Sequence, residues 1–185
     1  MAKISALTYI LLFALGAKLG FALPPRHDRN DVAFSRHDDR VYYDSKPFNG
    51  VQVERYSPSA IFREVQYVEG VREGVAREYS LNQRLIATAT YHNGVKEGRE
   101  LGWYEEGPPH FARNFKGGLL DGVQTEWNLA GGIFKQQRYA AGVESERKII
   151  FESGAVFTNY IRRDDRIYGI DGGALCMQKK PEGEK

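Results

Sequence analysis

The chain is almost free of cysteine: among its 185 residues only Cys176 is one. An intramolecular disulfide is therefore excluded. Cys176 stands in an apolar run, residues 174–177, which favours a buried thiol over a thiol that joins two copies of the chain.

A long apolar run is also missing. Residues 4–15 are mostly apolar, but Lys18 follows soon afterwards, so the stretch is too short for a comfortable membrane span. Lys3 precedes the stretch, and Gly20 and Ala22 provide small residues at positions −3 and −1 of a cleavage site. We predict a secretory signal peptide over residues 1–22, cleaved near Ala22, and export to a bacterial periplasm or the cell exterior.

Excess charge of either sign is absent as well. The chain has 26 basic and 24 acidic residues, and two of the basic ones, Lys3 and Lys18, lie in the predicted signal peptide, which has no acid. Subtracting these two leaves 24 basic against 24 acidic residues, a net charge of zero. Nucleic-acid binding normally needs a basic excess or patch, so no nucleic-acid partner is expected.

Recognisable catalytic motifs are lacking. There is no Gly-x-Ser-x-Gly elbow, and no glycine-rich loop that leads into a helix and could hold a phosphate. His27 and His37 lie in a polar segment where we expect solvent exposure, and His92 and His110 lie in predicted turns. The sequence therefore predicts that the protein is not an enzyme and has no metal site or cofactor.

What the sequence does have is an aromatic residue at every twelfth position. Aromatic residues make up 12% of the composition, so such a ladder is not a chance event. Its one missing member is Arg55, beside Tyr56. The ladder consists of Tyr43, Tyr67, Tyr79, Tyr91, Trp103, Phe115, Trp127, Tyr139 and Phe151. A fixed period of this kind identifies a repeat protein.

Glycines recur at twice that period and define a repeat unit of 24 residues. The two series are Gly70, Gly94, Gly118 and Gly142, and Gly50, Gly74, Gly98 and Gly122. Twelve residues suit one strand of about eight residues and a turn of about four. Residues 85–91 alternate in polarity, and turn-forming pairs such as Asn93-Gly94 separate the segments. The predicted fold is all-β, an elongated meander of antiparallel β-hairpins, with one ring per strand at the same height and stacked on its neighbours.

The unit resembles a known repeat. Tyr91-His92-Asn93-Gly94-Val95-Lys96-Glu97-Gly98, followed by Trp103-Tyr104, is similar to the bacterial variant of the MORN (membrane occupation and recognition nexus) repeat. The resemblance covers about residues 42–155, and the sequence departs from the pattern at Arg55, Gln83 and Glu146. It implies a single-layer β-hairpin ribbon that serves interaction or membrane association. Many bacterial proteins with this variant carry an antitoxin label, so the resemblance also implies an antitoxin-like role.

The chain divides into five segments on this interpretation. After the signal peptide we expect a flexible linker over residues 23–40, repeats over 41–155, capping strands over 156–178 and a disordered tail over 179–185.

Two sets of side chains could form a surface. Glu73, Glu97 and Asp121 share one phase and could line one edge as a carboxylate row; turn preference and solubility explain them better than a calcium site. Basic residues share the odd numbering of the aromatic ladder, and glutamates such as Glu64 and Glu100 are even-numbered. A mixed arginine and aromatic face is therefore the candidate interaction site: Arg77, Arg99, Trp103, Arg113, Trp127 and Arg147.

Two functions remain. The first, which we favour, is an exported, non-catalytic protein-interaction module, antitoxin-like in one form, with an unidentified protein partner. The second is association with an anionic membrane or envelope polymer through the arginine and aromatic face. The competing structural explanation is that arginine stems simply cover the rings.

Overall fold

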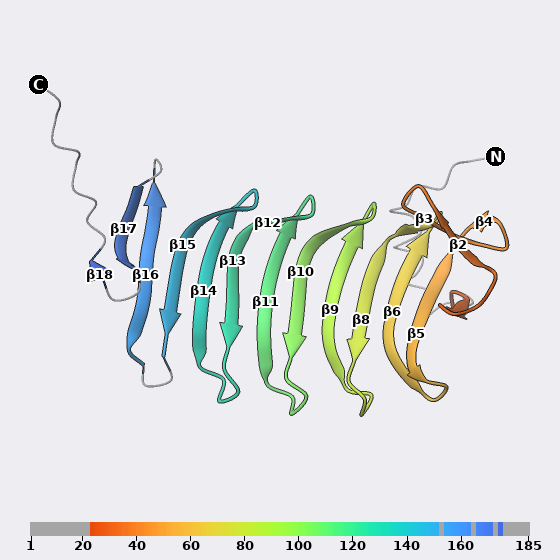
Figure 1. The fold of residues 1–185 in the computed structure, drawn as a ribbon, viewed down its shortest axis with the longest axis horizontal. Coiled ribbons are helices and arrows are strands. Elements are labelled where there is room, and N and C mark those ends of the chain that lie inside the picture. Colours follow the sequence, from red (N-terminus) through yellow and green to blue (C-terminus); the bar gives the residue numbers. More distant parts are fainter. Residues whose placement is uncertain (1–22, 152–153, 164–165, 172–173, 176–185) are drawn as a thin grey trace, which may run out of the picture. The chain divides into compact units, whose positions relative to one another are not determined.

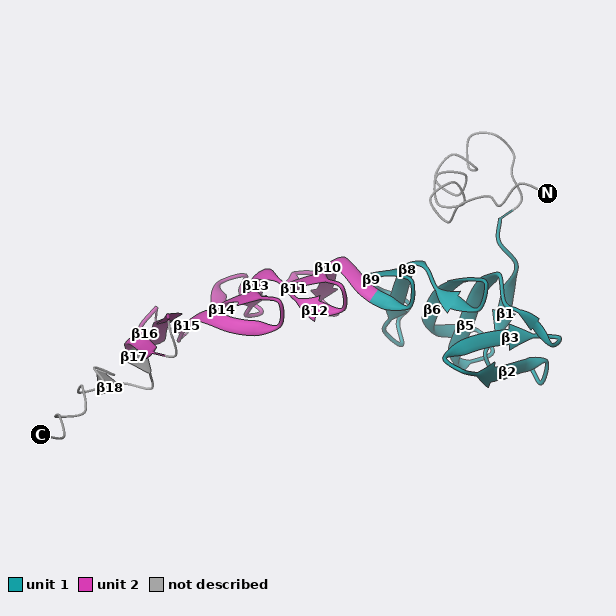
Figure 2. Ribbon diagram, turned by 90° about the horizontal axis from the view of Figure 1, so that it is seen from above, with its two compact units in different colours: residues 1–95 teal, residues 96–185 magenta. Residues whose placement is uncertain are grey.

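The computed structural model describes residues 23–151, 154–163, 166–171 and 174–175. All secondary structure in these residues is strand, and antiparallel hairpins follow one another along the chain (Figure 1). The predicted all-β hairpin meander is therefore confirmed. The predicted signal peptide, Cys176 and the tail lie outside the described residues. The chain divides into two compact units, residues 1–95 and 96–185 (Figure 2).

The first unit contains two sheets. In the larger one the strand order is β1-β5-β6-β8-β9, with β7 paired to β6; the smaller one has the order β2-β3-β4. The bounds are β1 Arg26–Asp28, β2 Phe34–His37, β3 Arg40–Tyr43, β4 Lys46–Pro47, β5 Gly50–Ser57, β6 Ala60–Val68, β7 Val71–Arg72, β8 Gly74–Tyr79 and β9 Leu85–His92.

The second unit is a meander in chain order. Its strands follow as β10-β11-β13-β14-β15-β16-β17-β18, with β12 paired to β11. The bounds are β10 Val95–Trp103, β11 Pro109–Lys116, β12 Leu119–Leu120, β13 Gly122–Trp127, β14 Ile133–Ala140, β15 Val143–Ile150, β16 Val156–Arg163, β17 Arg166–Asp171 and β18 Ala174–Leu175. The segment expected to cap the repeats thus continues the antiparallel pairing, with β16 against β15 and β17 against β16.

The expectation of a flexible linker over residues 23–40 was wrong. β1 pairs in parallel with β5, and the Val51 N–H donates to the carbonyl of Pro25 at 2.8 Å. β2 pairs with β3 as a hairpin. Polar composition suggested a loose arm, but alternate backbone groups of the edge strand β5 are hydrogen-bonded by this segment, and its apolar residues join a core.

That core belongs to the first unit and is aromatic. Val41, Phe48 and Tyr67 are buried, with Phe34 and Tyr43 packed against them. The ring centroids of Phe48 and Tyr67 lie 5.9 Å apart and those of Phe34 and Phe48 lie 5.0 Å apart. Large rings in such contact contribute both buried area and favourable ring geometry. The small sheet is held on the large one by this cluster.

Tight turns close the hairpins as the glycine pattern predicts. At Asn93-Gly94 both residues have positive φ, 49° and 86°, and at Gly117-Gly118 the values are 57° and 82°. Two consecutive positive φ values are what a type I′ turn requires, and its twist matches that of the paired strands. Glycine at the second position avoids the steric penalty that a Cβ brings there.

The aromatic ladder is arranged differently from the prediction. The expected single row of stacked rings was wrong, because consecutive members lie at opposite ends of the strands. Four members pair directly with glycines at the tight-turn end: Tyr67 with Gly50, Tyr91 with Gly74, Phe115 with Gly98 and Tyr139 with Gly122. Three pair at the other end: Tyr79 with Leu85, Trp103 with Pro109 and Trp127 with Ile133. Consecutive strands run in opposite directions, so equivalent positions in two consecutive strands lie at opposite ends of the sheet.

Three of the four rings at the tight-turn end pack on the side chain nineteen residues earlier. Tyr67 contacts Phe48, the guanidinium of Arg72 lies 4.7 Å from the centroid of Tyr91, and Nζ of Lys96 lies 5.0 Å from that of Phe115. These ladder residues therefore stabilise the packing of neighbouring strands, either through a contact between two rings or through a contact between a cation and a ring.

Candidate interaction surfaces

The predicted arginine and aromatic face does not exist as one face. Directly paired residues in a sheet share a face, and Glu100 pairs with Arg113 while Arg99 pairs with Asn114. Arg99 and Arg113 therefore lie on opposite faces of the second unit. In the first unit Arg77 pairs with Glu64. Most neighbouring strands pair odd-numbered with even-numbered residues, whereas β14 and β15 pair residues of equal parity, such as Gln137 with Arg147. Odd numbering therefore does not keep residues on one face of the sheet.

Several of the cations are neutralised across the sheet. Nη1 of Arg113 lies 3.5 Å from Oε2 of Glu100, and Nζ of Lys135 lies 3.3 Å from Oε1 of Glu126. In the first unit Arg63 is ion-paired with Glu78. These glutamates had been assigned to the face opposite the basic residues. Their pairing lowers the positive potential that an anionic surface would need.

Arg147, the last cation of the predicted set, belongs to a polar cluster around Glu144. The Glu144 carboxylate accepts three hydrogen bonds: from Arg147 Nη2 at 2.8 Å, from the Tyr160 hydroxyl at 2.5 Å and from the Tyr139 hydroxyl at 3.1 Å. Burial alone would raise the pKa of Glu144, but the hydrogen bonds from Arg147 and Tyr160 outweigh it and lower that pKa to about 2. Burial, with the hydrogen bond to Glu144, raises the pKa of Tyr160. The cluster ties β14, β15 and β16 together and leaves Arg147 committed to structure.

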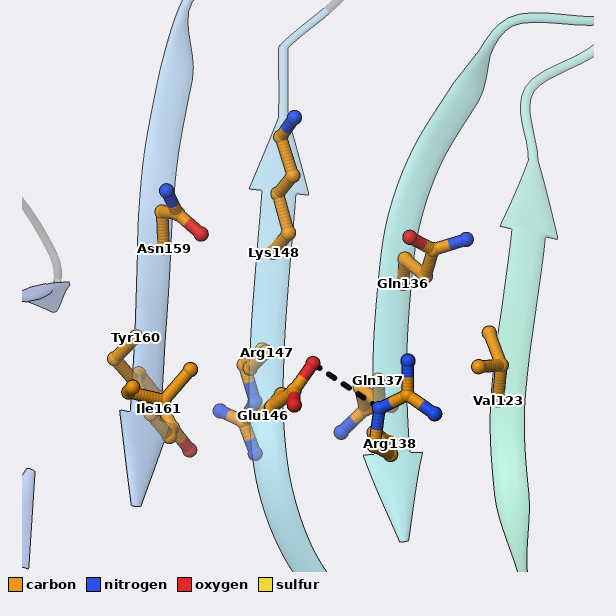
Figure 3. Close-up of a pocket in the computed structure, with 10 residues that line it drawn as sticks. All are labelled: Val123, Gln136, Gln137, Arg138, Glu146, Arg147, Lys148, Asn159, Tyr160 and Ile161. Atoms are coloured by element: carbon orange, nitrogen blue, oxygen red, sulfur yellow. Dashed lines mark ion pairs between the residues drawn. The ribbon is translucent and has the colours of Figure 1, made fainter. Parts of the chain in front are cut away.

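A small polar hollow lies near this cluster, on β13 to β16 (Figure 3). Its volume is about 130 Å³, and an ion pair of 3.2 Å between Arg138 and Glu146 crosses it. Ligand pockets usually measure roughly 300–1,000 Å³. The hollow is therefore too small to hold a cofactor or a drug-sized ligand.

The two tryptophans of the predicted set, Trp103 and Trp127, lie near hairpin loops. Trp103 lies beside the hairpin loop whose Tyr104 ring stacks on His110 at 4.3 Å. The carbonyl of Trp127 accepts the hydroxyl of Tyr104 at 2.9 Å. Both tryptophans lie at the loop end of their hairpins, opposite the tight turns.

The carboxylate row is a structural device that links hairpins. The side chains of Asn49, Glu73, Glu97 and Asp121 accept the backbone N–H of Glu69, Asn93, Gly117 and Ala141, at 2.9, 2.8, 2.7 and 3.1 Å. The shared phase of the three acids and of Asn49 was the sequence signal, and its meaning became clear only from the contacts. Within the described residues no group of three or more His, Cys, Asp or Glu side chains could hold a metal ion.

The histidines also have structural neighbours. His27 was expected in solvent, but its ring lies 4.1 Å from that of Tyr43 in the aromatic core. His92 Nδ1 lies 2.9 Å from Oε1 of Glu73. These contacts place both rings in packing or turn positions.

A different surface emerges at the loop end of the second unit. Five large apolar residues there are 40% to 54% exposed: Leu129, Ile133, Phe151, Val156 and Phe157. We call this set the apolar loop edge. Sequence reasoning missed it, because Leu129 and Phe157 belong to neither periodic series.

The members of the apolar loop edge are brought together by strand pairing. They lie in or directly beside the β13–β14 and β15–β16 loops, which are at the same end of the sheet (Figure 1). β14 pairs with β15 and Ile150 pairs with Val156, while the rings of Phe151 and Phe157 lie 5.2 Å apart. The β13–β14 loop, residues 128–132, has no charged residue in its sequence, and the β15–β16 loop, residues 151–155, has one, Glu152.

Comparison with known proteins assigns this chain to no family. No protein-family model matches the chain, and no curated protein matches it. One similar solved chain belongs to the "accessory secretory protein 1,2 and 3" structure from Streptococcus pneumoniae, with 16% identity and a TM-score of 0.32. The match covers 62% of this chain and 19% of that one, so this chain spans about a fifth of its length. Of the described residues, none forms a helix long and apolar enough to cross a membrane.

Proposed function

We propose that this chain is an exported, non-catalytic repeat protein that binds another protein through the apolar loop edge. The observation that carries the proposal is the exposure of five large apolar side chains in or beside two loops at the same end of the sheet. Exposed apolar clusters of this kind mark interaction sites in soluble proteins. Aromatic residues such as Phe151 and Phe157 are favoured anchors in such sites.

The architecture supports this role. Repeat proteins present extended surfaces, and their loops on one side commonly form the binding face. The resemblance to MORN repeats supports an interaction module, antitoxin-like in one form. Export remains part of the proposal and depends on residues 1–22.

Association with an anionic membrane or envelope polymer is the weaker alternative. It required one face that combined arginines with aromatic rings. Arg99 and Arg113 instead lie on opposite faces, and Arg113 and Arg147 are paired with Glu100 and Glu144. The surface charges that would attract an anionic polymer are thus dispersed and partly neutralised.

Affinity capture from a native envelope extract tests the proposal. The tagged full chain is compared with a variant that carries Leu129→Ser and Phe157→Ser. We expect a partner to be recovered in a fixed ratio with the wild type and to be lost with the variant. Binding of the purified partner should persist above about 0.3 M salt, where attraction between exposed charges is largely screened.

Leu81→Ser is the matched control. Leu81 is an exposed residue of the 80–84 loop, which is closed by the same backbone hydrogen bond as the 128–132 loop. This control should retain the partner. If the double variant recovered the same partner in the same ratio, or if binding vanished at that salt concentration, the apolar loop edge would not be the binding site.

A further inference from the structure

A groove of about 510 Å³ lies on the first unit, on the β5–β6–β8 surface beside the N-terminal segment. Pro24, Val51 and Val75 contribute apolar walls, and Glu64, Gln66 and Arg77 contribute polar groups. The volume falls within the range typical of small-molecule sites, roughly 300–1,000 Å³. The groove is distinct from the apolar loop edge, which belongs to the second unit.

The acids at the groove already have partners. Glu64 is 7% exposed, and its carboxylate is ion-paired with Arg26 and accepts the Tyr79 hydroxyl at 3.2 Å. Glu73 is 5% exposed and accepts the Asn93 N–H at 2.8 Å, with His92 at its other oxygen. Both carboxylates are satisfied, so neither needs a cationic ligand.

Two donors in the groove remain available. Arg77 makes no hydrogen bond or ion pair with any of the described residues, although Glu64 lies directly opposite it. Gln66 accepts the Val75 N–H through Oε1 at 2.9 Å, and its Nε2 has no acceptor in the described part of the chain. One guanidinium and one amide thus lack acceptors beside apolar walls.

The register brings these donors within reach of one another. Val51 pairs with Gln66 and Glu64 pairs with Arg77, so Gln66 and Arg77 come from adjacent strands, two residues out of register. Such diagonal neighbours are roughly 7–8 Å apart at the backbone, a span that long side chains bridge. A single carboxylate can accept from both, with Arg77 providing a charge-assisted bond.

We propose that this groove binds a linear apolar carboxylate, with the carboxylate on Arg77 and Gln66 and the alkyl chain along Val51 and Val75. The guanidinium of Arg77, which has no acceptor among the described residues, selects the anionic head, and the apolar walls select the chain. The limited volume favours a small molecule over the end of a protein partner.

Calorimetric titration of the full chain with decanoate tests this proposal, and decanol serves as the ligand control. We expect decanoate to bind at one site and decanol to bind at least about tenfold more weakly, since decanol lacks the charge-assisted hydrogen bond to Arg77. Arg77→Gln should weaken decanoate to the level of decanol. Arg63→Gln should leave decanoate binding unchanged, because Arg63 is already paired with Glu78.

Equal affinity for decanoate and decanol in the wild type would overturn the proposal and does not depend on any variant. Equal loss of binding in Arg77→Gln and Arg63→Gln, with both variants folded by circular dichroism, would also overturn it. Binding of an apolar peptide with a free C-terminus but not of decanoate would replace the small molecule with a protein ligand and count against the proposal. The variant of the apolar loop edge should lose the protein partner but still bind decanoate. The two proposals can therefore fail independently.

Discussion

The carboxylate of Glu97 accepts a hydrogen bond of 2.7 Å from the backbone N–H of Gly117, twenty residues further along the chain. The same link recurs one repeat later between Asp121 and Ala141. Beside each link a second, backbone bond runs from Gly118 to Lys96 and from Gly142 to Leu120, at 3.0 and 2.8 Å. In the second unit, one acid of each repeat thus holds the tight turn of the following repeat in place.

Removal of this link should weaken the fold measurably. Glu97→Ala leaves the Gly117 N–H without its acceptor, and we expect a loss of about 1 kcal/mol, the usual contribution of one hydrogen bond. Chemical denaturation followed by circular dichroism measures the change. Glu106→Ala, at an exposed loop position, should change stability by much less. Equal losses for the two variants would show that the link does not contribute.

Gly70 and Gly98 have the same φ of 76°, but replacement by alanine should destabilise the protein more at Gly70 than at Gly98. A Cβ at Gly70 would lie 2.5 Å from the Val41 carbonyl oxygen, whereas a Cβ at Gly98 would meet nothing within 4 Å. Gly98→Ala should therefore lose only the roughly 1–2 kcal/mol of a left-handed backbone. Gly70→Ala should lose a further 1–3 kcal/mol or so from overpacking. Thermal unfolding of the two variants gives the comparison, and equal melting temperatures would contradict it.

Acid should destabilise the protein through Glu144. Its pKa in the folded chain, about 2, lies below the ordinary value of 4.5, so the unfolded chain binds the proton first as the pH falls. The stabilisation is fully present above about pH 4.5 and is lost as the pH falls toward 2. Glu144→Gln should be less stable near neutral pH and should lose less stability between pH 4.5 and 2 than the wild type.

Denaturant titrations at several pH values measure this dependence. Glu146→Gln is the control, because Glu146 lies in an exposed ion pair with Arg138. An unchanged pH dependence in Glu144→Gln would show that the polar cluster around Glu144 has no role in acid stability.

Order in residues 23–40 can be tested by hydrogen exchange. The Val51 N–H donates to Pro25, and the Arg29 N–H donates to Val53 at 2.7 Å. We expect both amides to exchange slowly, at rates that follow the stability of the first unit. A loose N-terminal arm would leave Val51 unprotected on an open sheet edge. Phe48→Ala, which removes a buried ring of the aromatic core, should lose about 3–5 kcal/mol and release both amides.

Local features were predictable because short-range chemistry decides them. Asn93-Gly94 and Gly117-Gly118 form tight turns since their backbones tolerate positive φ, and the alternation in residues 85–91 gives the strand β9. The 24-residue unit therefore followed from spacing alone. The N-terminal segment was misjudged because its order depends on partners far along the chain, such as Val53 for Arg29.

The spacing of residues in the sequence does not predict on which face of the sheet a side chain lies. Arg99 and Arg113 share odd numbering, yet the register of β10 on β11 sends them to opposite faces. The apolar loop edge was missed for a related reason: Leu129 and Phe157 are far apart in sequence, and the pairing of β15 with both β14 and β16 brings them to the same end of the sheet.

By itself, the sequence determined that this protein is a series of β-hairpins, since glycine tolerates the turn backbone and alternation selects the strand. Only the tertiary structure decided which side chains meet. Antiparallel pairing places equivalent positions of consecutive strands at opposite ends, so it separates the rings into two rows, and the register pairs Arg113 with Glu100. Contacts between residues twenty or more positions apart then decide which apolar and charged groups remain for a partner.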